Sequence, residues 1–333
     1  MAVIMNILNF FRSKKVGLVL GSGGSRGLAH IAVIQYLESL EIPIHYIAGS
    51  SIGAVVGAVY ASGNLKEFKD ALLKMQKLEM MGYFDPVFPK SGLIEGKKVV
   101  DNLLKKYISP DMTIENLSPP VAVVATDLRS GKPVVFKTGN VLEAVRASIS
   151  IPGIFVPVTY NDTVLVDGGV TNPLPIDVVR KMGATLTVAV NLNPVNAGER
   201  LRKKMKKSEP EELDPDRIEH HTDNVRLDHS KIAKGKKDRS WLKSVERWLG
   251  IGGKSNTTSL PNIFEVMNRS IDVMGYANTM LMLKFNPPTV LIEPDLNDFS
   301  TLDFSGASRA ITEGFLACGK VRKQLIKKIK RKL

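Results

Sequence analysis

Short apolar runs alternate along the chain with segments whose apolar residues recur at helical spacing. Residues 16–20 predict a first buried strand, and the apolar spacing over residues 28–40 predicts a helix after it. A second apolar run at 44–48 and an apolar segment at 54–60 repeat this pair. Such alternation is typical of an α/β fold with parallel strands.

The pattern continues through most of the chain. Further helices are predicted at residues 65–77, 96–107, 141–149, 175–182, 261–284 and from 307 to the end. Further strands are predicted at residues 121–126, 133–137, 164–166, 185–192 and 289–292.

Changes in amino-acid composition divide the chain into five parts. An apolar segment at 1–14 precedes an α/β core at 15–193. Residues 194–260 are rich in charge and poor in apolar residues, which predicts a mobile insertion. The α/β domain resumes at 261–318, and 319–333 predicts a basic amphipathic helix.

The second strand leads into a G-x-S-x-G motif. Gly49, Ser50, Ser51 and Gly53 lie where the predicted strand passes into the next helix. A nucleophile elbow requires this context, because the serine lies on a sharp turn whose neighbours must be small. Ser51 is therefore the candidate nucleophile.

A glycine-rich loop, Gly21 to Gly27, follows the first strand. Gly23 and Gly24 have no side chains, so their backbone N–H groups can turn toward a developing oxyanion. Loops that leave neighbouring parallel strands converge, so this loop and the elbow can face one site. Nucleotide binding is the rival interpretation, but Arg26 replaces the last glycine of G-x-G-x-x-G and no P-loop lysine follows.

A serine nucleophile needs a base. Asp167 ends an apolar strand and precedes Gly168 and Gly169, which would leave its carboxylate accessible. A carboxylate hydrogen-bonded to Ser51 could take its proton if an apolar site raises the pKa of that carboxylate. Asp127 is the second candidate, although the residues after it are typical of a hairpin turn.

The histidines are weaker candidates for the base. His220, His221 and His229 lie in the charged insertion, which is a poor platform for catalytic geometry. His30 lies in the first predicted helix, and His45 lies at the start of the elbow strand, remote from its tip.

The charge of the chain points to an anionic partner. The 333 residues carry a formal net charge of +13, and 44% are hydrophobic, as in an ordinary globular protein. Cys318 is the one cysteine, which excludes an internal disulfide, fits a reducing compartment and is interpreted as a core residue. No apolar run is long enough to span a bilayer.

Three segments could meet a membrane surface. Residues 1–11 are apolar and lack the charge order of a secretory signal, so they predict either a helix packed on the body or an interfacial anchor. A short helix at 241–251 carries two tryptophans and is either docked on the body or in contact with lipid. The last helix carries an apolar stripe under a basic face, formed by Val321, Leu325, Ile329 and Leu333. This pattern predicts either a helix that contacts anionic lipid or a basic tail that frays.

Taken together, the motifs resemble those of the patatin-like phospholipases, and they are most similar to the bacterial members related to the catalytic domain of neuropathy target esterase. The resemblance lies in Gly21-x-Gly23-Gly24-x-Arg26-Gly27, then Gly49-x-Ser51-x-Gly53, then Asp167-Gly168-Gly169, with a further similar segment at Arg146 to Phe155. It covers residues 15–193 well and 261–294 more loosely.

The resemblance implies a three-layer α/β/α sandwich with a mostly parallel sheet. It implies a Ser-Asp dyad with Ser51 as nucleophile and Asp167 as proton acceptor, working without a metal or another cofactor. The residues implied for the oxyanion hole are Gly23, Gly24, Ser25 and Arg26. Where plant members carry aspartate at the first loop position this chain has Gly21, which changes nothing catalytic.

We therefore expect a cytoplasmic serine acyl hydrolase that cleaves phospholipid or lysophospholipid at the inner face of a membrane. The alternatives are a non-catalytic basic scaffold that retains the fold and, third, a nucleic-acid binder, for which no recognised binding motif is present. Acyl transfer to an alcohol other than water stays open. The sequence predicts neither head group, acyl chain nor oligomeric state.

Overall fold

The structure is a computed structural model that describes residues 14–74, 96, 99–193, 263–296, 299 and 306–333. Most of the apolar segment at 1–14, the whole insertion at 194–260 with its tryptophan helix, and the three histidines of that insertion lie outside these residues.

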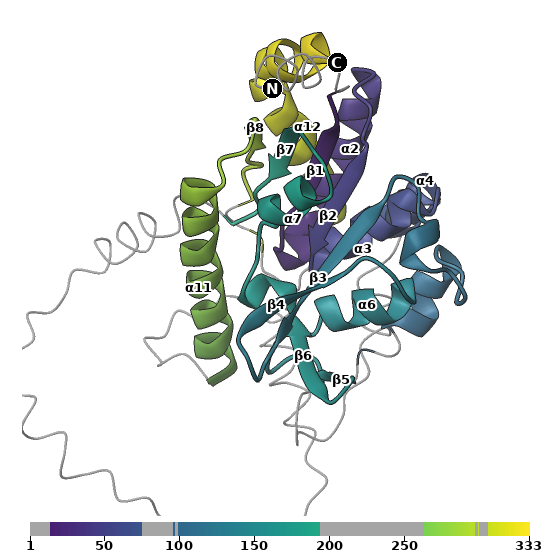
Figure 1. The fold of residues 1–333 in the computed structure, drawn as a ribbon, viewed down its shortest axis with the longest axis vertical. Helices are drawn as coiled ribbons and strands as arrows, with labels where there is room; N and C mark the ends of the chain where they lie inside the picture. The colour runs from purple at the N-terminus through teal and green to yellow at the C-terminus, as the bar shows by residue number, and fades with distance from the viewer. Residues whose placement is uncertain (1–13, 75–95, 97–98, 194–262, 297–298, 300–305) are drawn as a thin grey trace, which may run out of the picture. The chain divides into compact units, whose positions relative to one another are not determined.

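In the described part of the chain, eight strands form one sheet in the order β5-β6-β3-β2-β1-β7-β8, with β4 paired to β3 (Figure 1). The strands are β1 (Val16–Leu20), β2 (Tyr46–Ser50), β3 (Val121–Asp127), β4 (Lys132–Phe136), β5 (Val158–Tyr160), β6 (Thr163–Asp167), β7 (Leu186–Val190) and β8 (Val290–Ile292). Strands β3, β2, β1, β7 and β8 pair in parallel, whereas β4 and β6 run antiparallel to β3. The expected α/β fold with a mostly parallel sheet is confirmed.

Helices cover both faces of this sheet. The α-helices described are α2 (Ala29–Ser39), α3 (Ile52–Ala61), α4 (Leu65–Lys74), α6 (Val141–Ser148), α7 (Ile176–Lys181), α11 (Ile263–Phe285) and α12 (Ala307–Gln324). One core cluster joins one face of the sheet to α2, α3, α4, α6 and α12, and a second joins the other face to α7. This arrangement has the three layers that the resemblance implies.

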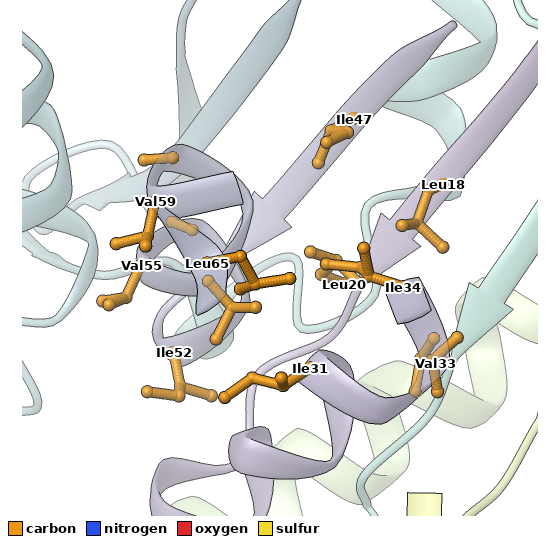
Figure 2. Packing of buried hydrophobic residues seen from close by; sticks show 14 of the residues in the cluster. Leu18, Leu20, Ile31, Val33, Ile34, Ile47, Ile52, Val55, Val59 and Leu65 are labelled. Carbon is orange, nitrogen blue, oxygen red and sulfur yellow. The ribbon is translucent and has the colours of Figure 1, made fainter. Parts of the chain in front are cut away.

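Strand β1 shows how its sequence serves both cores. Leu18 and Leu20 lie in the first cluster with Ile31 and Ile34 of α2, while Val19 lies in the second (Figure 2). Alternate side chains of a strand point to opposite faces, so a strand buried on both faces is apolar throughout. Each such side chain contributes about 1.5–3 kcal/mol on full burial.

Some expected elements differ in detail. The helix expected at 96–107 is a π-helical turn at Val99–Leu103 followed by a 3₁₀ turn at Leu104–Lys106, and a further 3₁₀ turn lies at Ile114–Asn116. The sequence did not predict β5, a three-residue strand at the edge of the sheet. Short edge strands bury too little for an apolar period to be visible.

The C-terminal helix buries part of its apolar stripe. After α12 the chain continues through Leu325–Ile329 and Lys330–Lys332, and both Leu325 and Ile329 are fully buried in the first core cluster. Cys318 of α12 is buried in the same cluster, as expected of a core residue, and burial raises the pKa of its thiol to about 12. Two residues of the stripe therefore belong to the core, whereas Leu333 at its end is 48% exposed.

Within the described ranges, no helix combines the length and the hydropathy that crossing a bilayer requires.

Candidate active site

Strands β2 and β6 pair with the same edge of β3, and their carboxyl ends lie next to each other there. Strand β2 runs parallel to β3 and ends with Ser50 opposite Val124, whereas β6 runs antiparallel and ends with Asp167 opposite Ala125. Strand β4 pairs with β3 across both stretches, so β2 and β6 must share the other edge. The carboxyl ends of β2 and β6 therefore meet, which brings Asp167 to the residue that follows β2.

That residue is Ser51, which lies between β2 and α3 with φ 54° and ψ −125°. A positive φ is rare and strained for a serine and is typical of a nucleophile elbow. Its neighbours leave no room for side chains: a Cβ on Gly49 would lie 2.5 Å from the Gly53 carbonyl oxygen, and one on Gly53 would lie 2.0 Å from the Leu20 carbonyl oxygen. The elbow glycines are required by close packing of α3 against the sheet.

The Ser51 hydroxyl donates a hydrogen bond to Oδ2 of Asp167, and both residues are buried. Oδ1 of Asp167 accepts the N–H of Gly169 at 2.7 Å. The backbone of Asp167 is fixed as well, because its N–H donates to the Ser150 carbonyl at 2.9 Å and its carbonyl accepts the Thr126 hydroxyl at 2.9 Å. The structure thus brings the expected nucleophile and the expected base into direct contact.

Burial raises the pKa of Asp167 to about 7, and the hydrogen bonds from Ser51 and Gly169 oppose this shift by stabilising the charged form. A carboxyl group with a pKa near neutrality can accept a proton and return it at neutral pH. This pKa is compatible with the role of proton acceptor that the sequence predicts for Asp167.

Ser148 on α6 is hydrogen-bonded to the turn that carries Ser51. The Ser51 backbone N–H donates to Oγ of Ser148 at 2.9 Å, and the Ser148 hydroxyl donates to the Val124 carbonyl at 2.6 Å. Ser148 is fully buried and links Ser51, the candidate nucleophile, to strand β3. Sequence reasoning placed Ser148 in a family-like segment but gave it no role; its short polar side chain among the apolar residues of a buried helix was the available signal.

Hydrogen bonds also connect the segment after α6 to Asp167, the candidate base. The Arg146 guanidinium donates to the Ser150 hydroxyl at 2.6 Å and to the Val156 carbonyl at 2.7 Å. Because the Ser150 carbonyl accepts the N–H of Asp167, Arg146 fixes the segment that positions the carboxylate.

The glycine loop is shaped by Arg26. Its Nε–H donates to the Gly23 carbonyl at 3.0 Å, and its guanidinium pairs with Asp272 of α11 at 3.2 Å. In a trans peptide the C=O and N–H point in opposite directions, so holding the Gly23 carbonyl fixes the opposite direction for the Gly24 N–H. Gly24 has φ +57°, which favours glycine. Among the described residues, neither the Gly23 N–H nor the Gly24 N–H has a hydrogen-bond acceptor.

The three motifs lie in contact with one another. A Cβ on Gly169 would lie 2.9 Å from the Ser22 side chain, and one on Gly27 would lie 2.2 Å from the side chain of Ile52 at the start of α3. Likewise, a Cβ on Gly168 would lie 2.7 Å from the Ser50 hydroxyl oxygen. The glycine loop, the elbow and the Asp-Gly-Gly segment therefore pack directly against one another. Two further loop residues, Gly21 and Ser25, are buried.

The other candidates for the base are used elsewhere. His30 is buried, and its Nε2–H bonds the Gly21 carbonyl at 2.8 Å; burial lowers the pKa of this histidine to about 4. Nδ1 of His45 accepts the Val16 N–H. Asp127 accepts bonds from Arg129 and Ser130 in the turn after β3. Among the described residues, Asp167 is the carboxylate that bonds Ser51.

Comparison with known proteins finds one family model and several related proteins that match this chain. A family model described as Patatin-like phospholipase matches residues 18–180, which include Ser51 and Asp167. An uncharacterised NTE family protein of Mycobacterium tuberculosis is 34% identical over 325 residues, covering 91% of this chain and 89% of that protein, and the Mycobacterium bovis protein matches equally. A lysophospholipase named NTE1 from Yarrowia lipolytica is 25% identical over 298 residues, 87% of this chain but 18% of that larger protein.

Proposed function

The chain belongs to the patatin-like phospholipase family, and from this premise we propose that it is a serine acyl hydrolase that cleaves fatty acyl esters of membrane lipids. The observation that carries the proposal is the hydrogen bond from the Ser51 hydroxyl to the buried Asp167 carboxylate. A hydroxyl is a weak nucleophile until an adjacent base takes its proton, and this contact supplies that base.

The reaction runs in two steps. Ser51 Oγ attacks the ester carbonyl while Asp167 accepts the hydroxyl proton and then passes it to the departing alcohol, leaving an acyl-serine ester. Water then attacks this ester; Asp167 takes one proton from the water and returns it to Ser51 Oγ as the fatty acid leaves. The Ser51–Asp167 pair therefore gives up one proton with the departing alcohol in the first step and regains one from water in the second.

The oxyanion of each tetrahedral intermediate needs hydrogen-bond donors. The N–H groups of Gly23 and Gly24 are the donors that we assign, with Arg26 holding the loop that presents them. The N-terminus of the ten-residue helix α3 lies just after Ser51 and favours negative charge there. Loss of one such donor typically lowers kcat by about 10²–10³-fold.

The substrate class follows from the relatives. The yeast relative is named a lysophospholipase, and the family model is described as phospholipase, so a phospholipid or lysophospholipid is the substrate that we propose. The formal net charge of +13 favours association with an anionic membrane surface as a peripheral protein, on the cytoplasmic side.

The test uses a fluorophosphonate probe for activated serines and the hydrolysis of lysophosphatidylcholine. Ser51→Ala should abolish labelling, and both Ser51→Ala and Asp167→Asn should lower kcat/KM by about 10³-fold or more. Circular dichroism checks that each variant is folded.

Two matched variants serve as controls. Ser50→Ala removes the adjacent buried hydroxyl, which has no hydrogen-bond partner in the described part, and Asp127→Asn alters a strand-end aspartate of the same sheet. Both should retain activity. An Asp167→Asn protein with substantial activity would refute the dyad, and an unreactive wild type would refute the hydrolase and favour the non-catalytic scaffold.

A further inference from the structure

Helix α11 exposes an apolar face. Its large apolar side chains with substantial exposure range from Met280 at 38% to Phe285 at 73%. The set comprises Val266, Val273, Met274, Met280, Leu281 and Phe285. With 3.6 residues per turn, these positions fall within about 140° of one another around the helix axis, so they lie on one side of the helix together with the exposed Ser270 and Lys284. We call these six residues the α11 apolar face.

Other positions of α11 fix the helix to the body of the protein. Asp272 pairs with Arg26, and the Asn278 side chain donates to the Val170 carbonyl at 2.9 Å. Thr279 is fully buried and accepts a bond from the Asn193 side chain at 3.0 Å. The α11 apolar face is therefore the outward side of a docked helix.

These contacts place the helix beside the candidate active site. Arg26 holds the glycine loop, and Val170 lies three residues after Asp167. A surface that covered the α11 apolar face would therefore contact the helix that packs against the glycine loop and the segment after Asp167.

The charge around the face selects the partner. The sequence contains no aspartate or glutamate from Val273 to Ile292, and its one charged residue there is Lys284, which is exposed on the same side of α11. Arg269 is exposed one turn before Val273. From Val273 to Phe285 the face carries a cation and no acid, and such a surface is complementary to lipid acyl chains beneath anionic head groups.

We propose that the α11 apolar face is the surface by which this protein docks on an anionic lipid bilayer, with the active site beside the contact. The proposal rests on the lipid hydrolase function above and locates its membrane contact on α11 rather than on the C-terminal helix. A second copy of the chain fits the face less well, because stable interfaces use about 20–30 residues on each side whereas this face offers six large apolar side chains.

The experiment compares the full-length protein with the triple variant Val273→Ser, Leu281→Ser, Phe285→Ser. Binding is measured by flotation with vesicles of phosphatidylcholine and phosphatidylglycerol in equal parts. The triple variant should bind these vesicles at least about tenfold more weakly, since three apolar side chains no longer enter the bilayer. Its thermal unfolding midpoint and its hydrolysis of a short-chain nitrophenyl ester should match those of the wild type.

The matched control is Phe315→Ser, Leu316→Ser, which removes two exposed apolar residues from α12. This control should bind vesicles like the wild type. Equal vesicle binding by the triple variant and the wild type would overturn the proposal. So would a wild type that does not bind vesicles and whose dimerisation, or protection of residues 194–262 from protease, is lost in the triple variant.

Failure of the docking surface and failure of the hydrolase can be told apart. The nitrophenyl ester and the fluorophosphonate probe report Ser51 without a membrane, whereas flotation reports the α11 apolar face without catalysis. A triple variant that labels fully and floats poorly supports both conclusions.

Discussion

The two sides of the candidate active site, the strand ends on β3 and helix α11, are held in place by different kinds of contact. Ser51 and Asp167 are positioned by strand register, since β2 and β6 end opposite neighbouring residues of β3. Helix α11 is joined to the site by single side-chain contacts, of which the Arg26–Asp272 pair leaves the Asp272 side chain 45% exposed.

This difference separates two properties of the enzyme. Backbone pairing in a buried sheet fixes atoms more tightly than a half-exposed ion pair does, and chemistry requires the tighter positioning. A helix joined by side chains can instead present a surface. We therefore expect changes at the strand ends to affect the chemical step most, and changes on α11 to affect mainly the loop and the lipid contact.

The largest effect is expected from the protonation of Asp167. Only the ionised carboxylate can accept the Ser51 proton, and burial raises its pKa to about 7. For a soluble ester, kcat/KM should fall about tenfold for each pH unit below 7 and level off above it. A profile that stays flat from pH 5 to pH 8 would contradict Asp167 as the base.

The same shift has a consequence for stability. Because the pKa is higher in the folded protein than in the unfolded chain, the favourable contribution of Asp167 is complete below its ordinary pKa of 3.8 and is lost as the pH rises through about 7. Asp167→Asn should therefore raise the thermal unfolding midpoint relative to the wild type more at pH 8 than at pH 4.

Asp127 is the comparison for this measurement, because hydrogen bonds from Ser130 and Thr163 lower its pKa to about 2. Its contribution is present above the unfolded value and is lost as the pH falls through about 2. Asp127→Asn should lower the midpoint at pH 8, and the same sign for both aspartates would show that burial does not dominate at Asp167.

An intermediate effect is expected at Ser148. Ser148→Ala leaves the buried N–H of Ser51 without its acceptor, which costs about 1–3 kcal/mol of stability and loosens the elbow. We expect kcat to fall by about tenfold to a hundredfold with little change in KM, since the N–H is not placed to bind substrate. Ser148→Thr, which retains the hydroxyl, should recover part of kcat.

Ser62→Ala is the matched control at the other end of α3. The Ser62 hydroxyl donates to the Val59 carbonyl at 2.9 Å and to that of Tyr107 at 3.0 Å. This variant should lose stability but retain kcat. If both serine variants lower kcat alike, Ser148 acts through general stability rather than through the elbow.

The contrast between the two sides also marks what the sequence could predict. The elbow and the glycine loop are local: their glycines, their flanking strands and the helix that follows lie within a few residues, so the pattern shows them. The meeting of Ser51 with Asp167 follows instead from antiparallel pairing of β6 with β3, and an apolar run of three residues carries no information about strand direction. The order of motifs in a known family supplied the pair where physical reasoning alone left Asp127 open.

Helices α11 and α12 show the same limit from another direction. Both carry apolar residues at helical spacing, and for the stripe that contains Leu325 and Ile329 the sequence left lipid contact and a frayed tail open. Leu325 and Ile329 are buried in the core, while α11 exposes Val273 and Leu281. Periodicity identifies an apolar face, but only tertiary packing decides whether another part of the protein already covers it.

The smallest effect is expected on the α11 side of the site, at Asp272. Asp272→Asn removes the charge that pairs with Arg26, but the bond from Arg26 to the Gly23 carbonyl remains. Partly exposed ion pairs contribute about 0–1 kcal/mol, so kcat for a soluble ester should fall by about fivefold at most, with KM unchanged. Asp70→Asn, which breaks the surface pair with Lys66, is the control and should change neither constant. A loss at Asp272 as large as that at Ser148 would mean that α11 helps to fix the oxyanion loop as firmly as the sheet fixes the elbow, and the distinction between the two sides would then fail.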